Sequence, residues 1–181
     1  MPVSGCPSPF AGDPALPPAL DVVTVATVNA SATPLQDGGS LTILPPPQGG
    51  SIVLVGVRAR NLDPCGVMLT VGLRDPQTQQ IRIDGRTVNL QTSTAAPDWV
   101  ETSSQLAGMA NVPVCPNQWA STDIFGHVFE LDVMVEDRAH RRATKTLQVT
   151  PVCSTDPILP STCPCQCMAG YKLGQACPPP R

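Results

Sequence analysis

A chain of 181 residues with a net charge of -3 is long enough for one domain with a hydrophobic core and appended segments. Hydrophobic residues make up 41% of the chain but aromatic residues only 3%, so the core must be aliphatic and β-branched, which favours strands over helices. The charge balance excludes a strongly basic nucleic-acid-binding face, and eight cysteines are typical of a disulfide-stabilised protein in an oxidising compartment.

The N-terminal segment combines a short motif with a proline-rich stretch. Val3-Ser4-Gly5-Cys6 resembles a bacterial lipobox, in which an aliphatic residue and two small residues precede the cysteine that becomes lipidated. The resemblance implies that Cys6 anchors the chain to an outer-membrane or cell-surface membrane, although no charged and apolar signal-peptide regions precede it in this sequence. Residues 1–20 would then be a lipidation site and a semi-rigid spacer. The alternative is that Cys6 forms an ordinary disulfide.

From Asp21 onward, short runs of alternating apolar and polar residues recur between turn residues, as is typical of a sandwich or barrel. They predict strands over 21–28, 40–44, 51–60, 67–74, 81–90, 127–137 and 143–151. In 127–137, Phe129, Leu131 and Val133 fall on one face and acidic residues on the other. Strands with one wet face predict antiparallel sheets packed face to face. The prolines after 40–44 indicate an edge strand there.

Segment 91–126 has only weak periodicity and many small polar residues. It predicts one or two short strands and the longest loops, and Gly108 disfavours the helical turn that 103–110 would otherwise allow. Because β-sandwiches present function at their loop ends, segments 75–80, 91–126 and 137–142 are the candidate ligand-binding loops.

The closing hairpin strengthens the all-β prediction. The sequence "ELDVMVEDRAHRRATKTLQVTP" is an apolar strand, a charged turn and a final strand ending in proline. It is similar to the last hairpin of immunoglobulin-like modules of bacterial surface and secreted proteins. The resemblance implies an immunoglobulin-like antiparallel β-sandwich of about seven strands over residues 21–152, which is a scaffold and specifies no catalysis.

Catalytic residues are not evident. General acid–base and nucleophilic catalysis most often recruit histidine, and the chain has only His127 and His140. Neither lies in a catalytic or phosphate-binding motif, and carboxylates such as Glu130 and Asp132 have the spacing of a solvated strand face. We therefore expect a non-enzymatic protein without a cofactor.

Calcium is the stronger rival to a purely structural interpretation. Asp75, Asp84, Asp123 and Asp137 lie near predicted loops, where extracellular sandwiches often bind calcium. The chain has no Asp-x-Asp-x-Asp run, so isolated aspartates that favour turn geometry are the preferred interpretation.

The turn at 137–145 concentrates basic residues. Arg138, His140, Arg141 and Arg142 lie close together in it, with Lys145 nearby. They could bind anionic glycans or lipid headgroups, or they could simply keep a solvated hairpin from aggregating, which is the interpretation we favour.

Two cysteines lie outside both termini. Cys65 and Cys115 each stand beside a proline in a predicted loop. A disulfide between these loops would stabilise the fold by about 2–4 kcal/mol, and it is our preferred pairing, although one sequence does not establish connectivity.

The remaining five cysteines fall in a C-terminal tail, residues 153–181. They are Cys153, Cys163, Cys165, Cys167 and Cys177. The pattern Cys165-x-Cys167-x-x-Gly170-Tyr171, followed by Cys177, resembles the C-terminal half of epidermal-growth-factor-like and trypsin-inhibitor-like modules. The resemblance implies that Cys167 bonds Cys177 and that Cys165 bonds Cys153 or another upstream cysteine. Cys163 is too close to Cys165 to match those modules.

Zinc binding and redox chemistry are the alternatives for these thiols, but both usually employ Cys-x-x-Cys. We therefore predict a non-enzymatic cell-envelope or extracellular lipoprotein that binds a protein or glycan ligand, or serves a structural role. The alternatives are a secreted protease inhibitor that presents residues 168–175, "MAGYKLGQ", and a zinc-binding module. If Cys6 carries lipid, seven cysteines remain and one of them lacks a partner within the chain.

Overall fold

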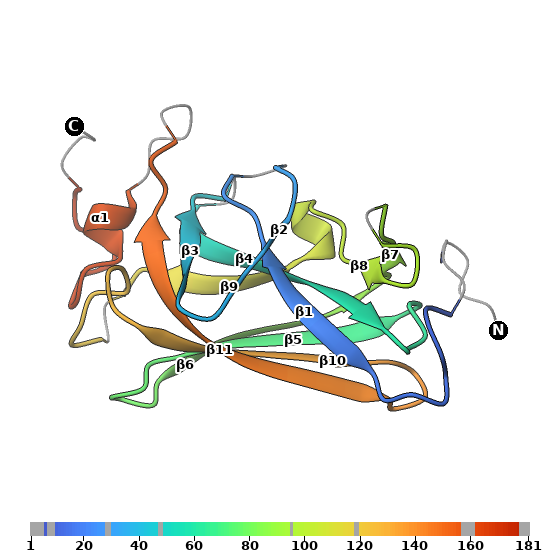
Figure 1. Cartoon of the computed structure of the whole chain (residues 1–181). Coiled ribbons are helices and arrows are strands. Elements are labelled where there is room, and N and C mark those ends of the chain that lie inside the picture. Colours follow the sequence, from blue (N-terminus) through green and yellow to red (C-terminus); the bar gives the residue numbers. More distant parts are fainter. Residues whose placement is uncertain are drawn as a thin grey trace.

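The computed structural model describes residues 6, 10–27, 30–46, 49–94, 96–117, 120–156 and 162–177. These residues form a nearly all-β fold (Figure 1). The strands are β1 (Ala19–Thr24), β2 (Thr33–Pro34), β3 (Gly39–Leu44), β4 (Ser51–Arg60), β5 (Val67–Arg74), β6 (Ile81–Val88), β7 (Gln91–Thr92), β8 (Val100–Glu101), β9 (Ala110–Cys115), β10 (Phe129–Glu136) and β11 (Arg142–Cys153). A 3-10 turn, η1 (Leu106–Gly108), and a short helix, α1 (Cys163–Gln166), complete the described part of the chain. None of its helices is long and apolar enough to span a membrane.

The strands join into one curled, mixed sheet. Its hydrogen-bonded order is β2-β1-β4-β3-β11-β10-β5-β6, and β8 and β9 pair with the other side of β4. All of these pairs are antiparallel except β3 with β11, which run parallel from Val149 opposite Gly39 to Cys153 opposite Ile43. In Figure 1 the sheet curls over itself, so that β1, β4 and β9 face β5, β10 and β11.

The position of β3 corrects one expectation. The segment 40–44 was predicted as an edge strand, but β3 lies between β4 and β11. Pro45 and Pro46 follow the strand rather than interrupt it, so its backbone donors remain available for pairing on both sides.

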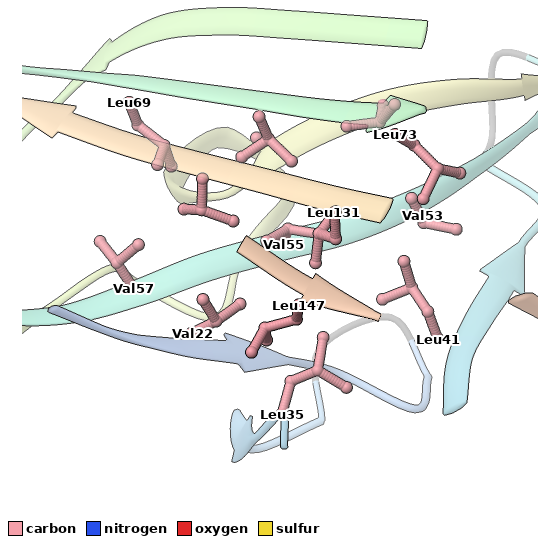
Figure 2. Close-up of a cluster of buried hydrophobic side chains, with 14 of the residues drawn as sticks. Val22, Leu35, Leu41, Val53, Val55, Val57, Leu69, Leu73, Leu131 and Leu147 are labelled. Atoms are coloured by element: carbon pink, nitrogen blue, oxygen red, sulfur yellow. The ribbon is translucent and has the colours of Figure 1, made fainter. Parts of the chain in front are cut away.

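The predicted alternation places the core correctly. Phe129, Leu131, Val133 and Val135 are buried along β10, as the period-2 pattern predicts. Figure 2 shows buried side chains from β1, β3, β4, β5, β10 and β11 pointing into the space that the curled sheet encloses. The labelled side chains in this view are all valine or leucine, which fits a core short of aromatic residues.

A second, smaller cluster covers the outer side of β1 and β4. It consists of Val23, Val25, Leu44, Leu54 and Met109. Gly56 on β4 allows close packing here, because a Cβ at this position would overlap Thr102 Oγ1 and lie 3.0 Å from Met109 Cε. Thr102 Oγ1 in turn accepts a hydrogen bond from Val57 N at 3.1 Å. A glycine therefore fits this position better than any residue with a side chain.

Segment 91–126 contains more structure than its weak periodicity predicts. It holds β7, β8 and β9 as well as η1, so the expectation of one or two strands was wrong. Two of these strands have only two residues, which is too short to produce an alternating pattern. The helical turn allowed over 103–110 forms only as the three residues of η1.

The proline-rich N-terminal segment lies against the domain and is not a free spacer over residues 10–20. Ala11 bridges to Leu62, and Asn61 N donates to Ala11 O at 2.7 Å. The Asn61 side chain accepts a hydrogen bond from Asp13 N at 3.0 Å and donates to Pro17 O at 2.9 Å. These hydrogen bonds satisfy backbone groups within residues 11–17, which precede β1 and contain prolines that cannot donate to a sheet.

Candidate functional site

The eight cysteines form four disulfides. These are Cys6–Cys65, Cys115–Cys167, Cys153–Cys163 and Cys165–Cys177. The preferred pairing of Cys65 with Cys115 was therefore wrong, and so was the pairing of Cys167 with Cys177 that the growth-factor resemblance implied. Cys165 does not bond Cys153 either. Three of the four disulfides fasten a terminal segment to the body of the domain. Cys6–Cys65 fastens the N-terminal segment to the loop after β4, and Cys115–Cys167 and Cys153–Cys163 fasten the tail to β9 and β11.

Local helix geometry explains the corrected pairing. Residues four apart lie on the same face of a helical turn, whereas residues two apart lie on opposite sides. Cys163 and Cys167 are both fully buried and reach Cys153 on β11 and Cys115 on β9. Cys165, between them, faces away and closes the tail through Cys177. Pro164 in the first turn favours a helix start and is the sequence signal that could have predicted this geometry.

Cys6 bonds Cys65, with 5.6 Å between their Cα atoms. A sulfur in a disulfide has no valence left for a lipid thioether, so lipidation and this disulfide are alternatives for the same atom. The Cys6–Cys65 bond fastens the N-terminal segment beside Leu62, where Ala11 is already paired.

The cysteines hold no metal in this arrangement. All eight are bonded to one another, and no group of three or more histidine, cysteine, aspartate or glutamate residues within the described ranges could hold a metal ion. A thiolate zinc site or a dithiol redox centre would require at least one of these disulfides to open.

The tail closes into a tight turn. Gln175 N donates to Lys172 O at 2.9 Å, and Gly174 has a φ of +86°, which only glycine adopts freely. The Tyr171 hydroxyl donates to Gln175 O at 2.7 Å and holds the turn to its base. Leu173 at the tip is 74% exposed. A peptide that binds by adding a strand to a sheet presents an extended backbone. The closed turn of this tail therefore does not have the conformation for that kind of binding.

The basic residues of the β10–β11 hairpin have partners both within the hairpin and in other parts of the protein. His140 Nδ1 lies 2.8 Å from Glu136 Oε1, and Arg142 Nε donates to Glu136 Oε2 at 2.9 Å. The hydrogen bond with His140, followed by those from Arg142, lowers the pKa of the Glu136 carboxyl below its ordinary value. Arg141 donates to Leu16 O and covers the Phe10 ring at 5.4 Å. Arg138 lies over Gly66.

The loop aspartates also have hydrogen-bond donors. Asp137 Oδ1 accepts from Ala139 N and Arg141 N, and its Oδ2 accepts from Asp63 N. Asp123 Oδ1 accepts from Ala169 N and so ties the tail to the body. These contacts fit aspartates that shape turns.

Asp84 and Arg82 bridge a gap in the curled sheet. The inward side chains of β6 reach toward β9, where Asp84 Oδ2 accepts a hydrogen bond from Asn111 N at 2.7 Å and pairs with Arg86. Arg82 donates to Asn117 Oδ1 at 2.6 Å, and burial lowers the pKa of its guanidinium. Inward-pointing charges of this kind protect a strand edge from pairing with another chain.

A hollow lined mainly by polar side chains lies partly outside the segments that the sequence predicted as binding loops. We call it the polar groove: a hollow of about 430 Å³ between residues 31–34 on one side and residues 91–94 and 101–104 on the other. Arg58 of β4 lines it and pairs with Glu101 of β8, with 3.5 Å between Arg58 Nε and Glu101 Oε2. Part of the groove lies in the predicted binding loop 91–126, but residues 31–34 carried no signal.

The two histidines lie apart from the polar groove. His127 lines a separate, smaller depression with Asp75 and Phe129, and His140 is at the hairpin tip beside Glu136. Comparison of the sequence with protein-family models and with curated proteins finds no match.

Proposed function

We propose that the protein is a secreted or cell-envelope binding domain without enzymatic activity, built on an immunoglobulin-like fold. The observation that carries the proposal is the complete pairing of eight cysteines in four disulfides. Disulfides of this number persist outside the reducing cytosol, and they stabilise small extracellular domains.

Strand order supports the immunoglobulin-like assignment. The order β11-β10-β5-β6 matches strands G, F, C and C′ in one layer of a variable-type immunoglobulin domain, and β1-β4-β9 matches strands A, B and E of the opposite layer. The short strands β2, β7 and β8 are additions to that plan, and β3 crosses between the two layers. This fold serves many unrelated binding and structural roles, so the assignment favours a scaffold.

A non-enzymatic role is supported by where the titratable groups lie. Glu136 is bound to His140 and Arg142, Asp137 shapes a turn, and Asp84 holds the edge of β6. Catalysis requires an acid, a base or a nucleophile to converge on one hollow, and these groups are directed at other parts of the protein instead.

The intact mass of the natively purified protein under non-reducing conditions tests the proposal. We expect a mass below that of the reduced chain by eight hydrogen atoms, two for each disulfide. Eight free thiols would contradict an extracytoplasmic role. A mass increased by a lipid, with Cys65 open to alkylation, would place the protein on a membrane through Cys6 instead.

A further inference from the structure

We propose that the polar groove binds a neutral saccharide, one or two sugar units of a glycan chain. The inference deepens the proposed binding function by naming its site and its ligand class, and it rests on that function. A hollow of about 430 Å³ falls in the usual range for small-ligand sites.

Unpaired hydroxyl groups line the groove. The side chains of Ser31, Thr94 and Ser104 form no hydrogen bond within the part of the chain that the structure describes. Each hydroxyl can both donate and accept, which is the capacity that sugar hydroxyls need from a binding surface.

Arg58 provides further donors. Its Nε is buried without a hydrogen bond and lies 3.5 Å from Glu101 Oε2, and its Nη2 donates to Ser93 Oγ at 3.4 Å. The guanidinium also carries N–H groups on Nη1 and a second one on Nη2 that find no acceptor among the described residues, and a ligand oxygen in the groove can accept from them.

The charge of the groove selects a neutral ligand. Glu101 lies beside Arg58, so donors and acceptors stand next to each other with no net charge. Neighbouring hydroxyls of a sugar ring match such a pair, because one can accept from the guanidinium while the next donates to the carboxylate. An anion would meet repulsion from Glu101, and a cation would meet repulsion from Arg58.

An apolar wall completes the match. Val23, Ala32 and Pro34 line the groove as well, the last two beside Ser31. The C–H face of a sugar ring can pack on these side chains while its hydroxyls meet the polar wall.

The test is an NMR titration of the oxidised protein with maltose, cellobiose and diacetylchitobiose, each to millimolar concentration, and with sodium sulfate as an anion probe. We expect at least one disaccharide to shift amide signals of residues 91–94 and 101–104, and sulfate to shift none. The double variant Thr94→Val and Ser104→Ala should bind about 10-fold more weakly, because it removes two hydrogen bonds. Thr144→Val, an exposed change on β11 outside the groove, should bind like the parent.

The proposal is overturned if no disaccharide shifts these signals, if sulfate alone shifts them, or if the double variant binds as tightly as the parent. A glycan-free peptide that shifts the groove signals where the sugars do not would also overturn it. None of these results changes the intact mass of the oxidised protein, which is the measurement that tests the proposed function. The two proposals can therefore fail independently.

Discussion

Cys163 and Cys167 lie on the same face of a single helical turn, and each bonds a different strand. Cys163 reaches Cys153 at the end of β11, and Cys167 reaches Cys115 at the end of β9. Because β9 pairs with β4 and β11 pairs with β10, α1 connects the two sides of the curled sheet where strand pairing between them is incomplete. The tail is therefore part of the domain's framework.

Removing the Cys115–Cys167 bond should cost more stability than removing Cys165–Cys177. The first closes a span of 52 residues and the second a span of 12, and the loss of chain entropy in the unfolded state grows with span. We expect C115S/C167S to lower the free energy of unfolding by about 4 kcal/mol and C165S/C177S by about 3 kcal/mol. Denaturant unfolding followed by circular dichroism measures both, and equal stability of the two variants would contradict a framework role for α1.

Mild reduction of the native protein should open Cys165–Cys177 before Cys115–Cys167. Cys167 is fully buried, whereas Cys165 and Cys177 are partly exposed, and a reducing thiolate must reach a sulfur to attack it. Alkylation followed by peptide mass mapping identifies the order. In denaturant the two disulfides should open at similar rates. If Cys115 is labelled before Cys165 in the native state, the tail is held to β9 less tightly than the structure describes.

Asn61→Ala should release the N-terminal segment and lower stability by about 1–3 kcal/mol, because it removes the hydrogen bonds to Asp13 and Pro17. Asn61 also has a φ of 61°, a conformation that asparagine tolerates better than alanine. Asn61→Gly is the matched control, since it keeps the conformation and loses only the side chain. Hydrogen exchange of residues 11–17 reports the release, and unchanged protection in both variants would show that Cys6–Cys65 alone holds the segment.

Gly56→Ala and Gly85→Ala should have opposite effects although both glycines lie in strands. A Cβ at Gly56 would overlap Thr102 Oγ1, and we expect a loss of about 1–3 kcal/mol from overpacking. A Cβ at Gly85 meets only Thr70 Oγ1 at 3.9 Å, so alanine should be neutral or stabilise by up to about 1 kcal/mol. Thermal unfolding of both variants measures the contrast, which would disappear if the contact between Thr102 and β4 were loose.

Much of the fold could be predicted from alternation, while the site and the cysteine pairing could not. The bounds of β4 and β5 coincide with the predicted 51–60 and 67–74, because apolar residues extend along each segment between turn residues, alternating in β5 and covering both faces in β4. The bonds from Cys163 to Cys153 and from Cys167 to Cys115 depend on a helix of four residues, whereas the growth-factor-like resemblance implied that Cys167 bonds Cys177. The polar groove brings Ser31 together with Thr94 and Ser104. These residues lie in segments without a periodic pattern, so their proximity could not be predicted from the sequence.

Asp75 should make the stability of the protein depend on pH in the acid range. Burial alone would raise the pKa of its carboxyl, but hydrogen bonds from the backbone of Gln77 and Thr78, with the Thr78 hydroxyl and the charge of Arg82, lower the pKa below the ordinary 3.8. A group whose pKa is lower in the folded state stabilises the protein above its ordinary pKa, and that contribution is lost as the pH falls through the folded-state pKa.

Asp75→Asn keeps an oxygen for the donors at 2.8 and 3.2 Å but removes the charge. We therefore expect Asp75→Asn to unfold at lower denaturant concentration than the parent at neutral pH, and the two midpoints to converge as the pH drops below 3.8. A difference that stays constant across this range would show that the charge contributes nothing and that geometry alone accounts for the effect of the substitution.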